Sequence, residues 1–249
     1  MTDKTLVLVT GGNQGLGYYA IQQLSATGKY HILMGSRDIN KAEAAIKTLT
    51  DDASAKANPD NVEPIQIDIL SDDSIYEAAK TVEKKYGYLD IIMINAGIAY
   101  TAGEKTKREQ FKQIFDTNVF GASITADAFI PLLRKSKAPD GKRIAFTGSG
   151  VSSIQWALES DGPISGVNFP IYRSSKTAES MIMVHYARLL ENEGFVVGAS
   201  DPGHCGTNLN GFSGAKDPRL GAKVLIKTAT EPKEKVHGRV INEDGFEPW

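Results

Sequence analysis

The most constraining feature of the chain is a glycine-rich turn close to its beginning. Residues 6–9 are a short apolar run that contains β-branched side chains, which is typical of a parallel strand covered on both faces. Gly11, Gly15 and Gly17 follow, and a helix-like segment begins among them. Glycines at these places allow a tight turn, a close approach of the backbone to a phosphate and close packing of helix on strand. The free amides and the dipole at the start of the helix favour a pyrophosphate there.

The spacing of the turn narrows the class of ligand. It reads Thr-Gly-x-x-x-Gly-x-Gly and lacks the Gly-Lys-Ser/Thr ending of a P-loop, which disfavours an ATPase. A glycine-rich turn alone also occurs as plain loop geometry. The rest of the chain must therefore decide between a nucleotide site and a simple turn.

The composition limits the classes of protein to consider. A length of 249 residues suits one α/β domain, residues 1–249, and is short for a catalytic module with a second domain. The formal charge of −2 disfavours nucleic acid or an anionic membrane as the main partner. A single cysteine, Cys205, suits a reducing compartment. Because the sequence has no signal-peptide core and no apolar run of about 18 residues, we expect a cytoplasmic protein without membrane insertion.

Strand-like and helix-like segments alternate along the chain. This alternation predicts a Rossmann-like, doubly wound α/β fold, with a seven-stranded parallel sheet flanked by helices. On the helix expected at 172–191, the apolar residues Met181, Ile182, Val184 and Leu189, together with His185, are expected to pack in the core or in an interface. Strands are expected at residues 6–9, 30–34, 62–67, 89–94, 143–147, 195–199 and 238–242, and helices at 16–26, 39–49, 73–86, 111–133, 172–191 and 217–230.

The ends of the second and third strands face the adenosine part of a dinucleotide in such a fold. The chain has Ser36 and Arg37 where a carboxylate would favour NAD, and this pair suits a 2′-phosphate. The sequence therefore favours NADP(H), although an arginine on a solvated loop is the simpler alternative. Asp68 and Ile69 follow the third strand, where the Asp68 carboxylate can accept from an adenine amino group or cap the next helix.

Tyr172 and Lys176 are the strongest local pattern for chemistry. Residues four apart share one face of a helix, so the phenol and the ammonium can meet at one ligand. An unperturbed phenol has a pKa of about 10 and is a poor acid or base near neutrality. A nearby ammonium favours the phenolate and lowers this pKa. Tyr-x-x-x-Lys also arises by chance on ordinary helix faces, so its context matters.

In combination these motifs resemble the short-chain dehydrogenase/reductase family, over nearly the whole chain. The glycine turn is followed, in family order, by Asn-Ala-Gly at 95–97, by Asn118 within a helix, by Ser149 beyond the fifth strand and by Tyr-x-x-x-Lys. A Pro-Gly turn at 202–203, with Thr207 after it, also matches.

The resemblance implies an NADPH-dependent reductase that converts a ketone or aldehyde to the alcohol by hydride transfer. Tyr172 would donate the proton and Ser149 would hydrogen-bond the substrate oxygen. Lys176 would hold the nicotinamide ribose, and Asn118, through water, would connect Lys176 to solvent. No metal is implied, and a homodimer or homotetramer is expected. The implied cofactor contacts are Gly11, Asn13, Gln14, Gly15, Leu16, Gly17, Ser36, Arg37, Asp68, Ile69, Asn95, Ala96, Gly97, Tyr172, Lys176, Pro202, Gly203 and Thr207.

The chain departs from the family pattern in several places. Gln14 stands where NADP-type relatives often have a basic residue, and Ser152 and Ser153 are less favoured alternatives to Ser149. The 23 positions between Ser149 and Tyr172 exceed the common spacing and indicate an insertion. We expect residues 150–171 and 203–217 to form substrate-side loops, the second with a glycine-rich lid at 208–216. Apolar residues of the insertion suggest a lipophilic or aromatic carbonyl substrate: Trp156, Ile164, Val167 and Phe169.

Two other functions remain open from the sequence. One is a non-catalytic NADP-binding sensor or scaffold, which the intact set of four polar residues disfavours. The other is a sugar-nucleotide epimerase or dehydratase, for which the chain is short. His204 and Cys205 lie close together but lack partners for a metal site, so we expect none.

Overall fold

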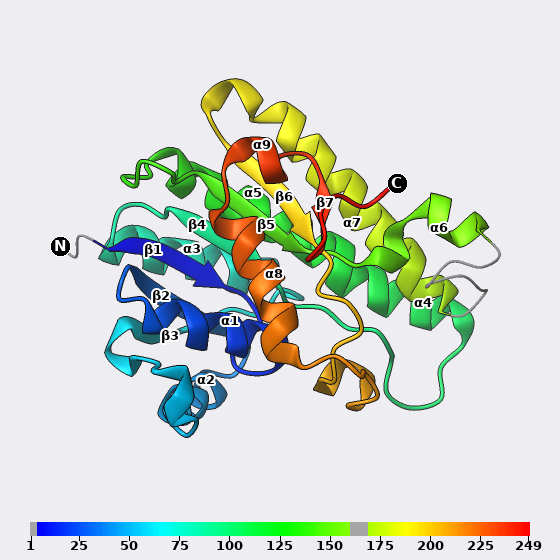
Figure 1. Cartoon of the computed structure of the whole chain (residues 1–249), viewed down its shortest axis with the longest axis horizontal. Coiled ribbons are helices and arrows are strands. Elements are labelled where there is room, and N and C mark those ends of the chain that lie inside the picture. Colours follow the sequence, from blue (N-terminus) through cyan, green and yellow to red (C-terminus); the bar gives the residue numbers. More distant parts are fainter. Residues whose placement is uncertain (1–3, 160–168) are drawn as a thin grey trace.

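The computed structural model of the protein describes residues 4–159 and 169–249. They form a seven-stranded parallel sheet in the order β3-β2-β1-β4-β5-β6-β7 (Figure 1). The strand order reverses beside β1, as in a doubly wound fold, so the predicted fold class is confirmed. The strands are β1 (Thr5–Val9), β2 (Tyr30–Ser36), β3 (Val62–Gln66), β4 (Ile91–Ile94), β5 (Arg143–Thr147), β6 (Val196–Ser200) and β7 (Val240–Ile241).

Helices cover both faces of the sheet, because successive side chains of a buried strand point to opposite faces. In β1, Leu6 and Leu8 pack in one core with Phe129 of α5. Val7 and Val9 pack in the other core with Ile21 of α1. The helices are α1 (Gly15–Ala26), α2 (Ile39–Lys47) and α8 (Pro218–Thr230) on one face, and α3 (Asp72–Lys85), α5 (Ala122–Arg134) and α7 (Pro170–Leu189) on the other.

The helix predicted at 111–133 is broken and starts earlier. It consists of α4 (Lys107–Phe115), a π-helical segment η3 (Asp116–Gly121) and then α5. A capping box fixes its start, because Thr106 and Glu109 each accept a hydrogen bond from the backbone N–H of the other. The prediction missed this pair because it followed the apolar positions alone.

The end of the π-helical segment, at Gly121, lies against the backbone of Ile69. A Cβ added to Gly121 would lie 2.3 Å from the carbonyl oxygen of Ile69, which follows β3. Only glycine fits at this crossing, since any larger residue would push the two segments apart. The wider π turn therefore places the end of η3 directly against the loop that leaves β3.

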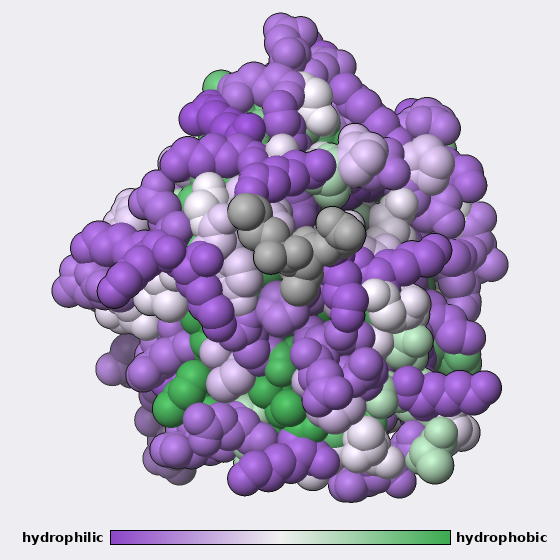
Figure 2. Space-filling model, turned by 90° about the vertical axis from the view of Figure 1, so that its left-hand side faces the viewer, coloured by the Kyte–Doolittle hydropathy of each residue, from purple (hydrophilic) through white to green (hydrophobic). Residues whose placement is uncertain are grey.

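The carboxyl ends of the strands gather at the edge of the sheet that also carries α4 and α6 (Ile154–Leu158), on the right of Figure 1. The opposite edge, where the strands begin, is mainly hydrophilic, with hydrophobic side chains visible in a few places (Figure 2). Ligands of doubly wound folds bind outside the carboxyl ends of the strands. A ligand site is therefore expected at the edge of the sheet where the strands end.

The insertion between Ser149 and Tyr172 buries only some of its apolar side chains. Ile154 and Leu158 of α6 are 59% and 83% exposed, and Trp156 is half-buried. Ile164 and Val167, which we expected at a pocket, lie outside the described residues.

The last five residues, 245–249, fold back onto the sheet. The Glu247 amide donates to the Val240 carbonyl at 3.0 Å, and the Gln155 amide of α6 donates to the Trp249 carbonyl at 2.7 Å. The Glu247 side chain is buried. Gly245, Phe246 and Trp249 remain exposed, so burial in this segment is confined to Glu247 and, in part, Pro248.

The residues predicted to pack in the core or in an interface divide into two groups on α7. Met181 and Leu189 are 69% and 59% exposed and do not reach the core. Ile182 and Val184 pack against the core, as predicted, beside the buried Met183, Tyr186 and Ala187. Towards the start of the helix the buried face is polar, and this polar part belongs to the site. A short helix, α9 (Lys233–Val236), precedes β7.

Candidate active site

The glycine turn leaves the start of α1 open to a ligand. Gly11 and Gly15 have φ values of +61° and +58°, which favour glycine. Gln14, at the N-cap, makes no side-chain capping bond, and the first turn contains no acidic residue. The first amides of α1 are therefore available to an anion. Together with Thr207 and Arg219, the turn borders a cavity of about 460 Å³ whose lining also includes Asn13, Gln14 and Gly15.

Asn95 fastens the end of β4 to this turn. Its Nδ2 donates to the carbonyls of Thr10 at 3.0 Å and Gly11 at 3.2 Å. The Thr10 hydroxyl accepts from the amides of Asn95 and Ala96. A Cβ on Gly17 would lie 2.6 Å from Asn95 Nδ2, so the start of α1 must also pass close by. Leu16, the neighbour of Gly17, packs against the core that contains α1 and α8.

At the end of β2, Ser36 and Arg37 have different surroundings. Ser36 is buried, and its hydroxyl accepts from the Asp38 amide at 3.3 Å. Arg37 is exposed and has no ion pair within residues 4–159 and 169–249. Its guanidinium is therefore free to meet an anion.

The end of β3 resolves the capping alternative for Asp68. Ser71, not Asp68, caps α3, because its hydroxyl accepts from the Ser74 amide. Asp68 accepts from the Leu70 amide at 3.1 Å. Ile69 is buried in the core, and its carbonyl faces Gly121.

Asn118 is fully buried in the π-helical segment and joins two parts of the chain. Its Oδ1 accepts from the Ile98 amide at 2.9 Å, and its Nδ2 donates to the Ile98 carbonyl at 2.8 Å. The same Nδ2 donates to Ser175 Oγ at 3.1 Å. The loop after β4, which includes Gly97, is thereby tied to α7.

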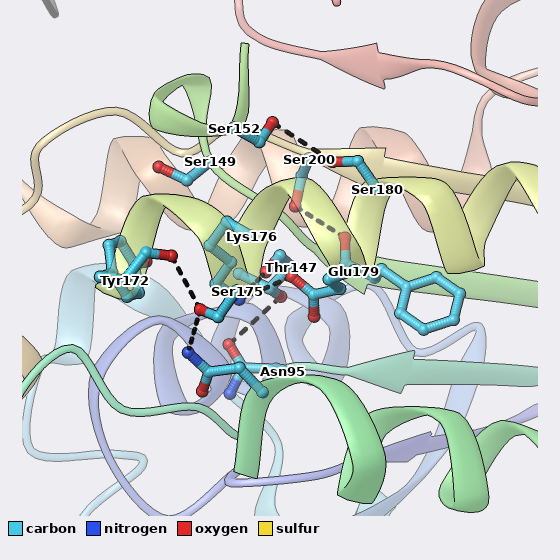
Figure 3. Close-up of polar contacts among 12 residues, drawn as sticks. Asn95, Thr147, Ser149, Ser152, Tyr172, Ser175, Lys176, Glu179, Ser180 and Ser200 are labelled. Atoms are coloured by element: carbon cyan, nitrogen blue, oxygen red, sulfur yellow. Dashed lines mark hydrogen bonds and ion pairs between the residues drawn. The ribbon is translucent and has the colours of Figure 1, made fainter. Parts of the chain in front are cut away.

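Lys176 and Tyr172 lie on the same side of α7, close to Ser149 (Figure 3). The Lys176 ammonium donates to the Thr147 carbonyl at the end of β5 and to Glu179 Oε2, both at 2.7 Å. It lies 5.9 Å from the centroid of the Tyr172 ring. Lys176 and Glu179 are both buried, with side chains 6% and 3% exposed. The Lys176 ammonium therefore lies beside the Tyr172 ring, while its two hydrogen bonds go to Thr147 and Glu179.

The two alternative serines have other partners. Ser153 caps α6 by accepting from the Trp156 amide at 3.1 Å. The Ser152 hydroxyl lies 3.2 Å from that of Ser180. Ser149, at the N-cap of the short helix η4 (Gly150–Ser152), accepts from the Val151 amide at 3.4 Å, and its side chain acts to lower the pKa of Tyr172. Its place near Tyr172 favours Ser149 as the serine of the site (Figure 3).

The surroundings of Tyr172 and Lys176 shift both pKa values. Burial raises the pKa of Tyr172; Lys176 opposes this, and the carboxylates of Glu179 and Asp201 add to it. Burial alone would lower the pKa of Lys176, but Glu179 and Tyr172 outweigh it, so the pKa is raised. Lys176 therefore stays charged, and the phenol of Tyr172 keeps its proton to higher pH than an exposed tyrosine.

Tyr172 also borders a second cavity, of about 410 Å³. Tyr100 and Phe169 meet edge to face at its wall, with ring centroids 5.8 Å apart. Lys107 and Gln110 of α4 contribute polar groups. The remaining lining is apolar apart from Thr101: Ala99, Ile114, Pro170 and Ile171.

The Pro-Gly turn lies beside the glycine turn. A Cβ on Gly15 would come 3.7 Å from the Thr207 side chain. Cys205 is buried; its thiol donates to the Pro202 carbonyl, and burial raises its pKa to about 11. The part of the chain that the structure describes holds no group of three His, Cys, Asp or Glu side chains that could bind a metal.

The chain is similar to known proteins over nearly its whole length. A family model described as short chain dehydrogenase matches residues 5–217. The short-chain dehydrogenase anuI of Penicillium roqueforti is 41% identical over 97% of this chain and 95% of its own length. The short-chain dehydrogenase/reductase tropE of Talaromyces stipitatus is 31% identical over 98% and 97%. The chain belongs to the short-chain dehydrogenase/reductase family.

Solved structures of the family share the fold at low identity. The NADPH-bound carbonyl reductase from chicken fatty liver has a TM-score of 0.81 at 23% identity, over all of both chains. The carbonyl reductase Sniffer of D. melanogaster has a TM-score of 0.80 at 23% identity, over 99% and 100%. As a family member the protein is an oxidoreductase of the class that uses nicotinamide cofactors. The uncapped α1 and the glycine turn fit such a dinucleotide.

One functional candidate was missed from the sequence. Glu179 is buried against Lys176, although acidic side chains on helices are mostly exposed. Its spacing of three residues from a lysine on the same helix was the available signal.

Among the helices that the structure describes, none has the length and apolar character needed to span a bilayer.

Proposed function

We propose that the protein is an NADPH-dependent reductase that converts a ketone or aldehyde of a lipophilic or aromatic small molecule to the alcohol. One observation carries the proposal: Tyr172, with the Lys176 ammonium 5.9 Å from its ring centroid, borders a largely apolar cavity at the edge of the sheet where the uncapped α1 begins. The cavity gives a carbonyl compound a place, and the pair gives it a proton source.

The proton comes from Tyr172 in this proposal. NADPH, when bound, would supply hydride to the carbonyl carbon, and Tyr172 would transfer its proton to the carbonyl oxygen. Ser149 donates a hydrogen bond to the same oxygen. Lys176 stabilises the phenolate that forms and binds a ribose hydroxyl, and Asn118 keeps the loop after β4 in register with α7.

Arg37 supports the choice of NADP(H) over NAD(H). It is exposed and without an ion pair in the described chain, directly after the buried end of β2. A guanidinium there can form charge-assisted hydrogen bonds with a 2′-phosphate. Asp68, beyond β3, retains a carboxylate for the adenine amino group, since Ser71 caps α3.

The cavity beside Tyr172 supports a lipophilic or aromatic substrate. Its aromatic wall of Tyr100 and Phe169 offers ring edges and faces for an aromatic ligand. The polar groups of Lys107 and Gln110 lie at α4, where they can orient a polar end of the substrate.

Tyr172→Phe tests the proposal. The variant should bind NADPH as the wild type does, measured by cofactor fluorescence, and lose about 10²- to 10⁴-fold in kcat with aromatic ketones, because phenylalanine has no proton to donate. Full turnover in the variant would refute the assignment. A wild-type protein that binds NADPH but consumes none with a panel of ketones would instead be a cofactor sensor.

We also propose that the protein is a cytoplasmic homodimer or homotetramer. Phe120 of η3 and Met181 and Leu189 of α7 are apolar and more than half exposed, and a second copy could cover them. Sedimentation analysis of the wild type checks this, and a monomer at all concentrations would contradict it.

A further inference from the structure

Glu179 is a buried carboxylate that the proposed chemistry leaves without a task. Its Oε2 lies 2.7 Å from Lys176 Nζ, and its side chain is 3% exposed. Removing a carboxylate from water is costly, and a buried ion pair often stabilises a fold no better than apolar side chains of the same volume. Stability alone is therefore a poor explanation for a charge at this position.

The contact with Glu179 restricts the Lys176 ammonium. An ammonium has three N–H donors. One donates to the Thr147 carbonyl and one to Glu179, both at 2.7 Å, so the third is left for a ligand. Figure 3 shows Lys176 between these two acceptors, next to Tyr172. Glu179 and Thr147 together fix where the charge of Lys176 lies.

Glu179 also changes the electric field at Tyr172. A lysine beside a phenol favours the phenolate, and a carboxylate in contact with that lysine opposes the effect. Burial is the main cause that raises the pKa of Tyr172, and Glu179 and Asp201, after β6, raise it further. Thr147 at the end of β5 and the residues of η4 are neutral, and Lys107 of α4 is a further cation that borders the same cavity as Tyr172. Burial raises the pKa of Glu179 and Lys176 opposes this, but phenols titrate far above carboxyl groups, so Glu179 is ionised when Tyr172 titrates.

We propose that Glu179 is a positioning residue of this site, whose carboxylate holds the Lys176 ammonium in place and cancels part of its field, so that Tyr172 keeps a proton to donate over a wider pH range. This favours carbonyl reduction, which needs the phenol, over alcohol oxidation, which needs the phenolate. The inference rests on the proposed function, because it gives Tyr172 the role of the acid.

The test is the ionisation of Tyr172 in the protein without cofactor or substrate. Ultraviolet difference titration of the wild type, minus that of Tyr172→Phe, isolates the phenolate of Tyr172. Glu179→Gln keeps the shape and removes the charge, and it should lower the midpoint by about one pH unit. The alkaline limb of the kcat profile for ketone reduction should move by the same amount, with KM for the ketone unchanged.

Two variants serve as controls. Glu179→Asp keeps the charge and should keep the wild-type midpoint. Asp127→Asn removes a different carboxylate that contacts α7, where Asp127 accepts from the Tyr186 hydroxyl at 2.7 Å away from Lys176. It should leave the midpoint unchanged.

An unchanged midpoint in Glu179→Gln would overturn the inference. If that variant does not fold, the wild type still decides, since a Tyr172 midpoint at or below about 10 would also overturn it. A protein that shows the shift but reduces no carbonyl compound refutes the proposed function. A protein that reduces carbonyl compounds without the shift refutes the role of Glu179.

Discussion

Replacing Asn118 by alanine should destabilise the protein and disturb its site together. The side chain is fully buried and makes three hydrogen bonds, two of them to the backbone of Ile98. Ser175 keeps its own donation to the Tyr172 carbonyl, so the main loss falls on the amide and carbonyl of Ile98. Each buried group left without a partner costs about 1 to 3 kcal/mol. Since Ile98 is partly exposed, we expect a total of about 2 to 4 kcal/mol.

Urea denaturation followed by circular dichroism measures this loss. For a chain of this size, a loss of about 2 to 4 kcal/mol corresponds to a fall in Tm of about 4 to 16 °C. Asn40→Ala is the matched control for stability, because Asn40 is an exposed asparagine on α2, on the face of the sheet opposite α5 and α7, and its replacement should cost less than about 0.5 kcal/mol. Turnover of Asn118→Ala should also fall, since the loop at Gly97 loses its link to α7. Equal stability of the two variants would refute the reasoning.

Two further substitutions test the role of Arg37 in cofactor choice and the burial of Glu247 near the end of the chain. Arg37→Asp should shift the ratio of kcat/KM for NADPH over NADH by about tenfold or more, because a charge-assisted contact with the 2′-phosphate becomes repulsive; unchanged selectivity would make Arg37 a simple surface residue. Burial beside Asp201 raises the pKa of Glu247 from 4.5 to about 9. The stability that this carboxyl contributes is complete below pH 4.5 and is lost as the pH rises towards about 9. The urea midpoint of Glu247→Gln should therefore change less between pH 4.5 and about 9 than that of the wild type. Equal pH dependence of the two midpoints would contradict this.

The sheet could be predicted well from the sequence because its strands are short apolar runs between turn residues. β5 has the predicted bounds, Arg143–Thr147, and ends at a glycine and a serine that stop the strand. β4 begins two residues later than predicted, at Ile91, since Asp90 uses its buried carboxylate to accept from the Leu6 amide at 2.8 Å. Apolar periodicity places a strand but does not reveal such polar anchors.

The candidate site was predicted only in part, for a similar reason. Motif order gave Asn118, Ser149, Tyr172 and Lys176, and the structure brings Ser149, Tyr172 and Lys176 together while Asn118 joins the neighbouring loop to α7. Glu179 was missed because a lone glutamate on a helix is usually solvated, and only tertiary packing shows that this one is buried.

The π turn at Asp116–Gly121 constrains how this region can vary. A π turn amounts to one extra residue in the helix, so losing one residue there would rotate all of α5 by about 100° relative to α4. Ala122, Ala126 and Phe129 would then leave the core. Deletions and insertions among related sequences should accordingly avoid these six positions and collect in the surface loops, and grafts between family members should exchange α4, η3 and α5 as one block.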